Sequence, residues 1–264
     1  MTQLVHTPEA LAQALPAGPI SLVPTMGALH SGHLALVRAA KSLGNPVVVS
    51  IFVNPLQFAP GEDLEKYPRT LAEDVEKLEA LGADAVFAPA PETMYPHGPR
   101  TTIQPGPLGG VLEGATRPTH FAGVLTVVAK LLALTGASDA FFGEKDYQQL
   151  ALIRQMVDDL HLPVRIHGCP IVRDTDGLAL SSRNRYLSAE ERATALAIPR
   201  ALATGSLAEA RSLLDATEGL HLDYLVATAP DMSDLSEGYT GPARLLVAAK
   251  VGATRLLDNA PIEL

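Results

Sequence analysis

Two histidines, His30 and His33, stand where a strand-like stretch of the sequence changes into a helix-like stretch. Residues 20–23 form an apolar run, and the apolar residues between 34 and 43 recur near helical spacing. Because the histidines are three residues apart, both rings are expected on one face of the first helical turn. Backbone N–H groups at a helix start attract anions. The pattern therefore indicates a site for a phosphate or a nucleotide.

The same two histidines have an ordinary alternative, because a pair at this spacing often lies on a solvated helix face. A zinc site is a weaker interpretation, since it needs a third ligand and the single cysteine, Cys169, stands in no metal-binding spacing. The glycines at 27 and 32 favour the nucleotide, because they let a flat base or a phosphate approach the backbone. We expect Ser31 or Gly32 to be the N-cap of the helix.

Composition limits the possible partners. The 264 residues carry 20 Lys and Arg against 29 Asp and Glu, a net charge of −9, and no dense basic run. Nucleic acid is therefore not expected as a partner. A single cysteine suits a reducing compartment. Neither a secretory leader nor an apolar run long enough for a membrane span is recognisable. We expect a cytoplasmic protein that binds small molecules.

A second polar segment follows a strand expected over Pro46–Val53. This run is apolar on both faces, as in a central parallel strand that helices cover on both sides. Asn54 and Gln57 come directly after it, at the strand end where open α/β sheets bind ligands. Turn formation explains Asn54 equally well, because Asn-Pro favours turns.

A third polar segment, Gly143–Gln149, follows a strand expected over Ser138–Phe142 and opens a helix. Asp146 and Gln149 have a structural explanation as a helix N-cap and its capping-box partner. Further along, residues 174–177 read Asp-Thr-Asp-Gly and indicate a turn. A calcium loop is a poor alternative, because Arg185 stands where the terminal glutamate would be required.

These elements predict an α/β protein with a Rossmann-like parallel sheet, helices on both faces of that sheet, and a smaller α+β C-terminal domain. Thr70 and Glu73 are expected to form a capping box at the start of a helix. Beyond Asn184, capped helices and strand-like runs replace the earlier pattern. The expected domains are 1–172 and 173–264.

Four segments together resemble one enzyme family. Pro24–His33 is similar to the His-x-Gly-His signature of nucleotidylyl transferases and class I aminoacyl-tRNA synthetases, in the form typical of pantoate–β-alanine ligases. The other three are similar to that family's pantoate segment, ATP segment and mobile phosphate-binding loop, and they are Asn54–Phe58, Gly143–Gln149 and Leu180–Asn184. The resemblance spans nearly all of the chain.

The sequence departs from the family pattern at a few places. Thr119 stands where the family usually has glycine, which stiffens the segment before a helix. Leu180 replaces the usual methionine and keeps an apolar contact. The region between Gly205 and Gly219 is shorter than usual.

The resemblance implies an ATP-dependent, AMP-forming ligase. In this family pantoate and ATP first give a pantoyl adenylate and pyrophosphate. The amine of β-alanine then displaces AMP to give pantothenate, a precursor of coenzyme A. ATP and Mg²⁺ are the implied cofactors, with the metal bound mainly through the phosphates and no protein ligand assigned. The resemblance also implies a homodimer formed through the N-terminal domain, 1–172, which would bind nucleotide and pantoate.

The resemblance also assigns residues to each substrate. Those assigned to ATP are Pro24, Thr25, Met26, Gly27, Ala28, Leu29, His30, Ser31, Gly32, His33, Gly143, Glu144, Lys145, Asp146, Val172, Leu180, Ser181, Ser182 and Arg183. Those assigned to pantoate are Met26, Asn54, Gln57 and Gln149, and Gln57 is also assigned to β-alanine. The implied catalytic groups are His30, His33, Lys145 and Arg183, with His33 as the proton donor.

Two other functions remain open from the residues alone. Another adenylyl transferase, for example one acting on a mononucleotide, would share the histidine signature but lack the Gln57 and Gln149 segments. A non-catalytic nucleotide-binding module could keep the fold, but it would not need Lys145 and Arg183 together.

Overall fold

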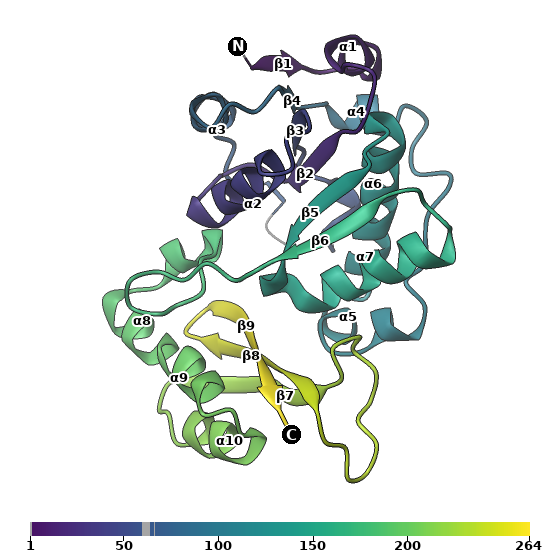
Figure 1. Ribbon diagram of the computed structural model, residues 1–264. Helices are drawn as coiled ribbons and strands as arrows, with labels where there is room; N and C mark the ends of the chain where they lie inside the picture. The colour runs from purple at the N-terminus through teal and green to yellow at the C-terminus, as the bar shows by residue number, and fades with distance from the viewer. Residues whose placement is uncertain (1, 60–63, 66) are drawn as a thin grey trace. The chain divides into compact units, whose positions relative to one another are not determined.

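The computed structural model describes residues 2–59, 64–65 and 67–264. The chain divides into two compact units. Unit 1 comprises Met1–Glu144 and Leu152–Cys169, and unit 2 comprises Lys145–Ala151 and Pro170–Leu264. Figure 1 shows the chain with its elements labelled. The predicted division into functional domains, 1–172 and 173–264, stays a prediction.

Among the described residues, unit 1 is built on a sheet of six parallel strands in the order β1-β4-β3-β2-β5-β6 (Figure 1). The strands are β1 (Gln3–Val5), β2 (Ser21–Thr25), β3 (Val47–Ile51), β4 (Ala85–Phe87), β5 (Asp139–Gly143) and β6 (Arg165–Cys169). Each neighbouring pair is parallel, which confirms the predicted sheet. β1 was not predicted, because three residues are too few to show a strand periodicity.

Helices cover both faces of this sheet, as predicted. Val47 and Val49 share an apolar cluster with side chains of α2 (Ser31–Lys41) and α3 (Leu71–Ala80). Val48 lies between them, points to the opposite face and is also fully buried. α1 (Pro8–Ala14) and α6 (His120–Thr135) pack together, and α6 contacts β2. Figure 1 shows α1 and α6 on the side of the sheet away from α2 and α3.

Short helical segments fill the connections of unit 1. They are η1 (Pro55–Gln57), α4 (Pro91–Met94), η2 (Pro107–Gly110) and α5 (Glu113–Thr116). The chain passes between the units at η3 (Glu144–Asp146) and along α7 (Tyr147–Asp159). None of the helices in the described residues has the length and apolar character that a membrane span requires.

The predicted capping box of Thr70 and Glu73 is wrong. Thr70 is the N-cap of α3, but its side chain makes no cap hydrogen bond. Its hydroxyl donates instead to Oδ2 of Asp74 at 3.0 Å. A hydrogen bond to a charged carboxylate is stronger than one between neutral groups, so the hydroxyl turns toward Asp74 and not toward the backbone N–H groups of the first helical turn.

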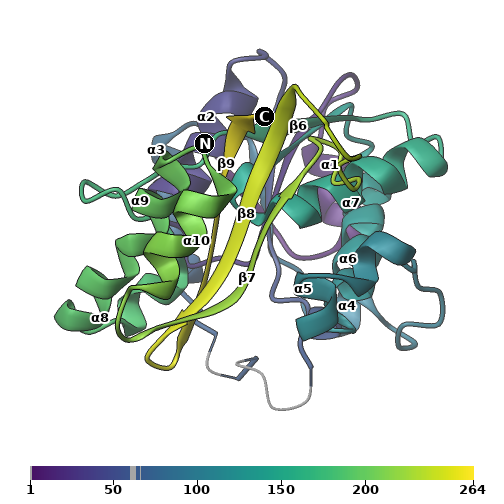
Figure 2. The ribbon, with the colours of Figure 1, turned by 90° about the horizontal axis from the view of Figure 1, so that it is seen from below.

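Unit 2 contains, within the described residues, an antiparallel sheet of three strands in the order β7-β8-β9. The strands are β7 (Leu220–Thr228), β8 (Pro242–Val251) and β9 (Thr254–Glu263). Three helices lie along one face of this sheet (Figure 2): α8 (Ala189–Ala195), α9 (Ala197–Ala203) and α10 (Leu207–Asp215). Side chains such as Ile198, Leu214 and Leu245 join both layers in one core. The predicted smaller α+β region is confirmed.

Two details of unit 2 follow from its side chains. Ser188 and Glu191 form a capping box at the start of α8, as their spacing indicates. β9 was not predicted, because Asp258 and Asn259 interrupt its apolar pattern and yet both are buried.

α6 packs tightly against η1 at Gly123. A Cβ atom at this position would overlap the carbonyl group of Leu56 and lie 2.6 Å from the backbone nitrogen of Gln57. Gly123 therefore allows the helix to approach the backbone that follows β3, and a larger residue would push the two elements apart.

The variant Gly123→Ala is expected to lower the free energy of unfolding by about 1–3 kcal/mol, because its methyl group overpacks this contact. Denaturant unfolding followed by circular dichroism measures the change. Gly110→Ala is the control, since a Cβ there meets no atom within 4 Å. If both variants unfold at the wild-type denaturant concentration, the close contact at Gly123 is wrong.

Candidate active site

The loop between β2 and α2 carries the two histidines through a tight turn. Gly27 has φ 80° and Ala28 has φ 52°, both in the left-handed region. A Cβ at Gly27 would lie 3.1 Å from Cγ2 of Ile51, so the position also lacks room for a side chain. Thr25 fixes the start of the turn, because its hydroxyl donates to the carbonyl of Ser50 at 2.7 Å and accepts from the N–H of Gly27 at 3.2 Å.

His30 is the N-cap of α2, one residue before the predicted Ser31. Its Nδ1 accepts from the N–H of Gly32 at 3.2 Å, and Nδ1 of His33 accepts from the N–H of His30 at 3.4 Å. The predicted N-cap is wrong because an imidazole nitrogen takes the role that a serine hydroxyl usually has. The ring centroids lie 4.1 Å apart, which confirms that both histidines share one face.

These hydrogen bonds decide where each neutral imidazole carries its proton. Since Nδ1 of both rings accepts from a backbone N–H, the proton lies on Nε2. In this tautomer the Nε2 atom of each ring is a donor rather than an acceptor, at the start of a helix whose dipole also favours negative charge. This arrangement suits an anion that gains charge during a reaction.

α3 contacts the same loop from a distant part of the chain. Asp74 has no exposed surface, and its two carboxylate oxygens accept from the N–H groups of Ala28 and Leu29, each at 2.8 Å. Asp74 was not predicted from the sequence. A single acidic residue in the first half of an amphipathic helix looks like a solvated position, and no local spacing indicates that it is buried.

The polar segment after β3 forms a connected cluster around Gln57. Asn54 donates from Nδ2 to Oε1 of Gln57 at 3.2 Å and to the carbonyl of Gly123 at 3.0 Å. Nε2 of Gln57 donates to the sulfur of Met26 at 2.9 Å. Asn54 thereby fixes the amide orientation of Gln57 and turns its NH₂ group toward Met26. Three of the residues predicted to bind pantoate are thus brought together in unit 1.

Residues from the irregular stretch before α6 complete this cluster. The hydroxyl of Tyr95 donates to Oδ1 of Asn54 at 3.0 Å, and burial raises the pKa of Tyr95 to about 12. Arg117 and His120 each contact the carbonyl oxygen of Gln57, at 3.2 and 3.0 Å. These three roles were not predicted, since a stretch rich in proline and glycine gives no periodicity from which to place its side chains.

Gly143 ends β5 and Glu144 follows it, and β2 lies between β3 and β5 in the sheet. The loop of the histidines, the Asn54–Gln57 segment and Gly143–Glu144 therefore leave the carboxyl ends of three adjacent parallel strands. This is the edge at which ligands bind in open α/β sheets. Within unit 1 the first two polar segments and the start of the third therefore lie at one edge of the sheet, and their role as one site stays a prediction.

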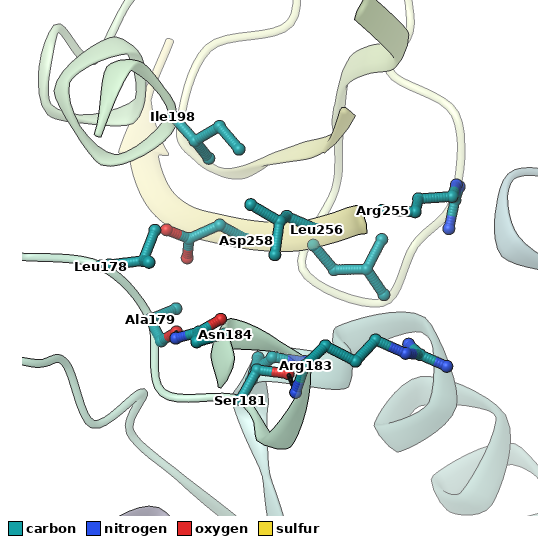
Figure 3. Close-up of a pocket in the computed structure, with 11 residues that line it drawn as sticks. Leu178, Ala179, Ser181, Arg183, Asn184, Ile198, Arg255, Leu256 and Asp258 are labelled. Carbon is teal, nitrogen blue, oxygen red and sulfur yellow. Dashed lines mark hydrogen bonds between the residues drawn. The ribbon is translucent and has the colours of Figure 1, made fainter. Parts of the chain in front are cut away.

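Unit 2 has its own candidate site, a pocket beside the predicted phosphate-binding loop (Figure 3). Its charged and hydroxyl lining comes from Lys145, Ser181, Arg183, Arg255 and Asp258. Apolar side chains of Leu178, Ile198, Leu256 and Leu257 line it as well. In the view of Figure 3 the guanidinium groups of Arg183 and Arg255 lie on the same side of the pocket. Arg255 also binds the carboxylate of Asp223 at 2.6 Å, and Lys145 pairs with Asp146 at 3.3 Å. Cationic side chains beside the hydroxyl of Ser181 suit a phosphate.

The predicted phosphate-binding loop begins on a short β-bridge. Arg173 pairs with Ala179 across this bridge, and the N–H of Leu180 donates to the carbonyl of Val172 at 2.9 Å. Ser181 then caps η4 (Ser182–Tyr186), because its hydroxyl accepts from the N–H of Arg183 at 3.2 Å. These bonds give the loop a defined backbone.

Two arginines hold the turn that precedes this loop. Arg173 binds both carboxylate oxygens of the buried Asp258, at 2.6 and 2.9 Å. Arg192 donates to Asp174 and Asp176 at 2.7 Å each. The hydrogen bond from Arg192 lowers the pKa of Asp176. Residues 174–177 therefore form a turn closed by an arginine, in agreement with the turn interpretation of the sequence.

Two further predicted residues, Lys145 and Gln149, lie in η3 and in the first turn of α7. Lys145 forms an ion pair with Asp146 at 3.3 Å, and its carbonyl accepts from Asn259 at 3.0 Å. Gln149 lies half-buried in the first turn of α7. In the part of the chain that the structure describes, no group of three His, Cys, Asp or Glu side chains could hold a metal ion.

The family model described as pantoate-beta-alanine ligase matches residues 3–261 of the chain. The chain belongs to the pantoate–β-alanine ligase family. A pantothenate synthetase from Corynebacterium jeikeium is 62% identical over 257 residues, which cover 93% of this chain and 83% of the relative. One from Nocardia farcinica is 62% identical over 255 residues, which cover 93% and 80%. The predicted family and enzyme class are confirmed.

Solved structures agree with the ligase family. A pantothenate synthetase from Thermus thermophilus matches with a TM-score of 0.92 at 47% identity, over 98% of this chain and 99% of that one. A pantoate–β-alanine ligase from Francisella tularensis, complexed with βγ-ATP and β-alanine, matches with a TM-score of 0.84 at 36% identity, over 98% and 97%. The predicted fold class, with its parallel sheet and smaller C-terminal α+β region, is therefore confirmed.

In a ligase of this family, Asn54→Asp is expected to weaken pantoate binding by about 1–3 kcal/mol, while ATP binding changes little. A carboxylate at position 54 only accepts hydrogen bonds, so the amide of Gln57 is expected to reverse and to turn its oxygen, in place of its NH₂ group, toward Met26. This reversal removes the donor that the family resemblance assigns to pantoate. Isothermal titration with each substrate measures both affinities.

Tyr95→Phe is the matched control, because Leu56 and Gly123 still hold the Asn54 amide in place. Its affinity for pantoate is expected to stay near that of the wild type. If Asn54→Asp weakens ATP and pantoate equally, the orientation of Gln57 does not govern pantoate binding.

Proposed function

We propose that the chain joins pantoate to β-alanine through a pantoyl adenylate, with AMP and pyrophosphate as the other products. One observation carries this proposal. The adjacent rings of His30 and His33 and the oriented amide of Gln57 follow neighbouring parallel strands of one sheet. Hydrogen-bond donors for a phosphate and for a small carboxylic acid therefore lie at the same sheet edge, as a reaction between ATP and the acid requires.

In the first step, a carboxylate oxygen of pantoate attacks the α-phosphorus of ATP. A new P–O bond forms, and the bond to pyrophosphate breaks. In the second step, the amine of β-alanine attacks the acyl carbon, AMP leaves and the amine loses a proton. Both nucleophiles come from the substrates, so the chain needs no covalent nucleophile. Cys169 is poorly suited to such a role, because burial, and to a lesser degree Glu144, raises the pKa of its thiol.

The histidine pair is proposed to stabilise the charge that develops on the phosphates. The Nε2–H groups of His30 and His33 would donate to phosphate oxygens, and His33 would be the proton donor. Donors that the fold already holds in place stabilise a transition state better than water does, because they need no reorganisation. The backbone from Pro24 to Gly32 would contact the nucleotide beside them.

Residues on both sides of the β5–α7 turn and in the second unit are also proposed to contact ATP. The ammonium group of Lys145 is a compact charge that can bind a single phosphate oxygen. The planar guanidinium group of Arg183 can bind two oxygens at once. Ser181 and Ser182 add hydroxyl donors. Backbone or side-chain contacts are further proposed for Gly143, Glu144, Asp146, Val172 and Leu180.

Magnesium is proposed to enter with the nucleotide. The cations and hydroxyls of the candidate site suit phosphate rather than a divalent ion, so the phosphate oxygens are the proposed ligands. When bound, Mg²⁺ neutralises charge on the phosphates.

Pantoate is proposed to bind through neutral amides and a thioether, in contact with Met26, Asn54, Gln57 and Gln149. An amide orients a carboxylate by hydrogen bonding without neutralising it, so the carboxylate stays a good nucleophile. An arginine at these positions would bind pantoate more tightly and slow its attack. Gln57 is also proposed to contact β-alanine in the second step.

The proposal includes two properties of the whole protein that the family resemblance implies. We propose a homodimer formed through residues 1–172 and a cytoplasmic location. Small molecules are the proposed partners, in line with a net charge of −9 that repels nucleic acid.

Pyrophosphate exchange tests the two-step reaction. With Mg²⁺, ATP and pantoate but without β-alanine, labelled pyrophosphate is expected to enter ATP, because the adenylate forms reversibly. Omission of pantoate is expected to stop the exchange. Exchange that requires β-alanine would instead show a concerted reaction of three substrates and would contradict the proposal.

Two variants extend this assay. His33→Asn keeps an acceptor near the Nδ1 position but removes Nε2, and it is expected to slow exchange by roughly 100-fold or more. Lys145→Met keeps the apolar stem, removes the charge and is also expected to suppress exchange. Lys41→Met at the far end of α2 is the control for a lost lysine and is expected to leave the rate unchanged.

A further inference from the structure

Asp74 is a fully buried carboxylate that the reaction does not use directly. It has no exposed surface, and each of its oxygens accepts a backbone N–H bond of 2.8 Å, one from Ala28 and one from Leu29. These two residues immediately precede His30. The carboxylate therefore holds the last turn of backbone before the histidine pair.

A second residue of α3 binds the next peptide group of the same segment. Lys77 donates from Nζ to the carbonyl of Leu29 at 3.1 Å and lies 3.7 Å from the carboxylate of Asp74. The hydroxyl of Thr70 donates to Asp74 at 3.0 Å. Both the N–H and the C=O of Leu29 are thus bound by side chains of one helix, α3, which begins more than 40 residues later in the chain.

The conformation that these bonds hold is an unfavourable one. Ala28 has φ 52°, a region that residues with a side chain rarely adopt. Without the carboxylate, the N–H groups of Ala28 and Leu29 would also be buried without a partner. The loop would then relax toward ordinary backbone angles, and His30, whose ring caps α2 and whose N–H binds His33, would move with it.

We propose that Asp74 is a positioning residue for the histidine pair, which aligns His30 and His33 for the transition state through the backbone of Ala28 and Leu29. The inference rests on the proposed function of these histidines and deepens it. Two acceptor oxygens are required, because an asparagine would present one NH₂ group to a backbone N–H and push that peptide away.

Asp74→Asn is therefore the decisive variant. It is expected to lower kcat by about 10-fold to 100-fold, as small misplacements of catalytic groups do, while KM for pantoate stays near the wild-type value. Protein labelled with ¹³C at the histidine Cε1 position gives a second readout. The signals of His30 and His33 are expected to shift, and single substitutions of each histidine assign them.

Asp139→Asn is the matched control, because Asp139 is also a buried carboxylate of unit 1 but lies at the start of β5, where it binds His167 at 2.8 Å. This variant is expected to shift the His167 signal and to leave kcat unchanged. A general effect of losing a buried charge would instead alter both sites in both variants, and that result would overturn the inference.

The inference is also overturned if Asp74→Asn is folded and retains wild-type kcat and histidine signals. If Asp74→Asn does not fold, Lys77→Met decides, since Lys77 lies partly exposed on α3 and its loss frees the carbonyl of Leu29. A fall in kcat with shifted His30 and His33 signals supports the inference, and unchanged values overturn it. Failure of the proposed function is distinct, because the wild type would then form no pantothenate while the histidine signals still report on the loop.

Discussion

The geometry of the histidine pair depends on two hydrogen bonds, from the N–H groups of Ala28 and Leu29 to the carboxylate of Asp74. A chain that leaves a buried parallel strand and enters a helix within a few residues loses the strand partners of its N–H groups before the helix can replace them. Buried N–H groups need other acceptors. Asp74 supplies them from α3, and the left-handed Ala28 then directs the backbone into the cap at His30.

The order of the strands determines which other segments lie beside this turn. β2 lies between β3 and β5, so the histidine loop shares its sheet edge with the Asn54–Gln57 segment and with Gly143. The two chemical tasks of the proposed reaction, phosphate stabilisation and orientation of an acid, thus fall to neighbouring loops. Gly123 also contributes to this arrangement, because the absence of a side chain lets α6 approach the backbone of Gln57.

Much of this architecture could be predicted, because long apolar runs and polar strand ends are local signals. The apolar run at Val47–Ile51 predicts a buried strand, and the spacing of His30 and His33 predicts that both rings share one helix face. Each signal lies within a few residues. β1 and β9 were missed, since one is too short and the other carries buried Asp258 and Asn259. Asp74 and Tyr95 were missed for a different reason. Their partners lie more than 40 residues away in the chain, and only the folded structure joins them.

In the proposed reaction the carboxylate of pantoate itself attacks the α-phosphorus of ATP. Pantoate labelled with ¹⁸O in both carboxylate oxygens tests it directly, with β-alanine present and the products analysed by mass spectrometry. One labelled oxygen is expected in AMP, because the bridging oxygen of the adenylate leaves with the phosphate, and the other is expected in the amide carbonyl of pantothenate. AMP without label, or label in any other phosphate product, would contradict the mechanism.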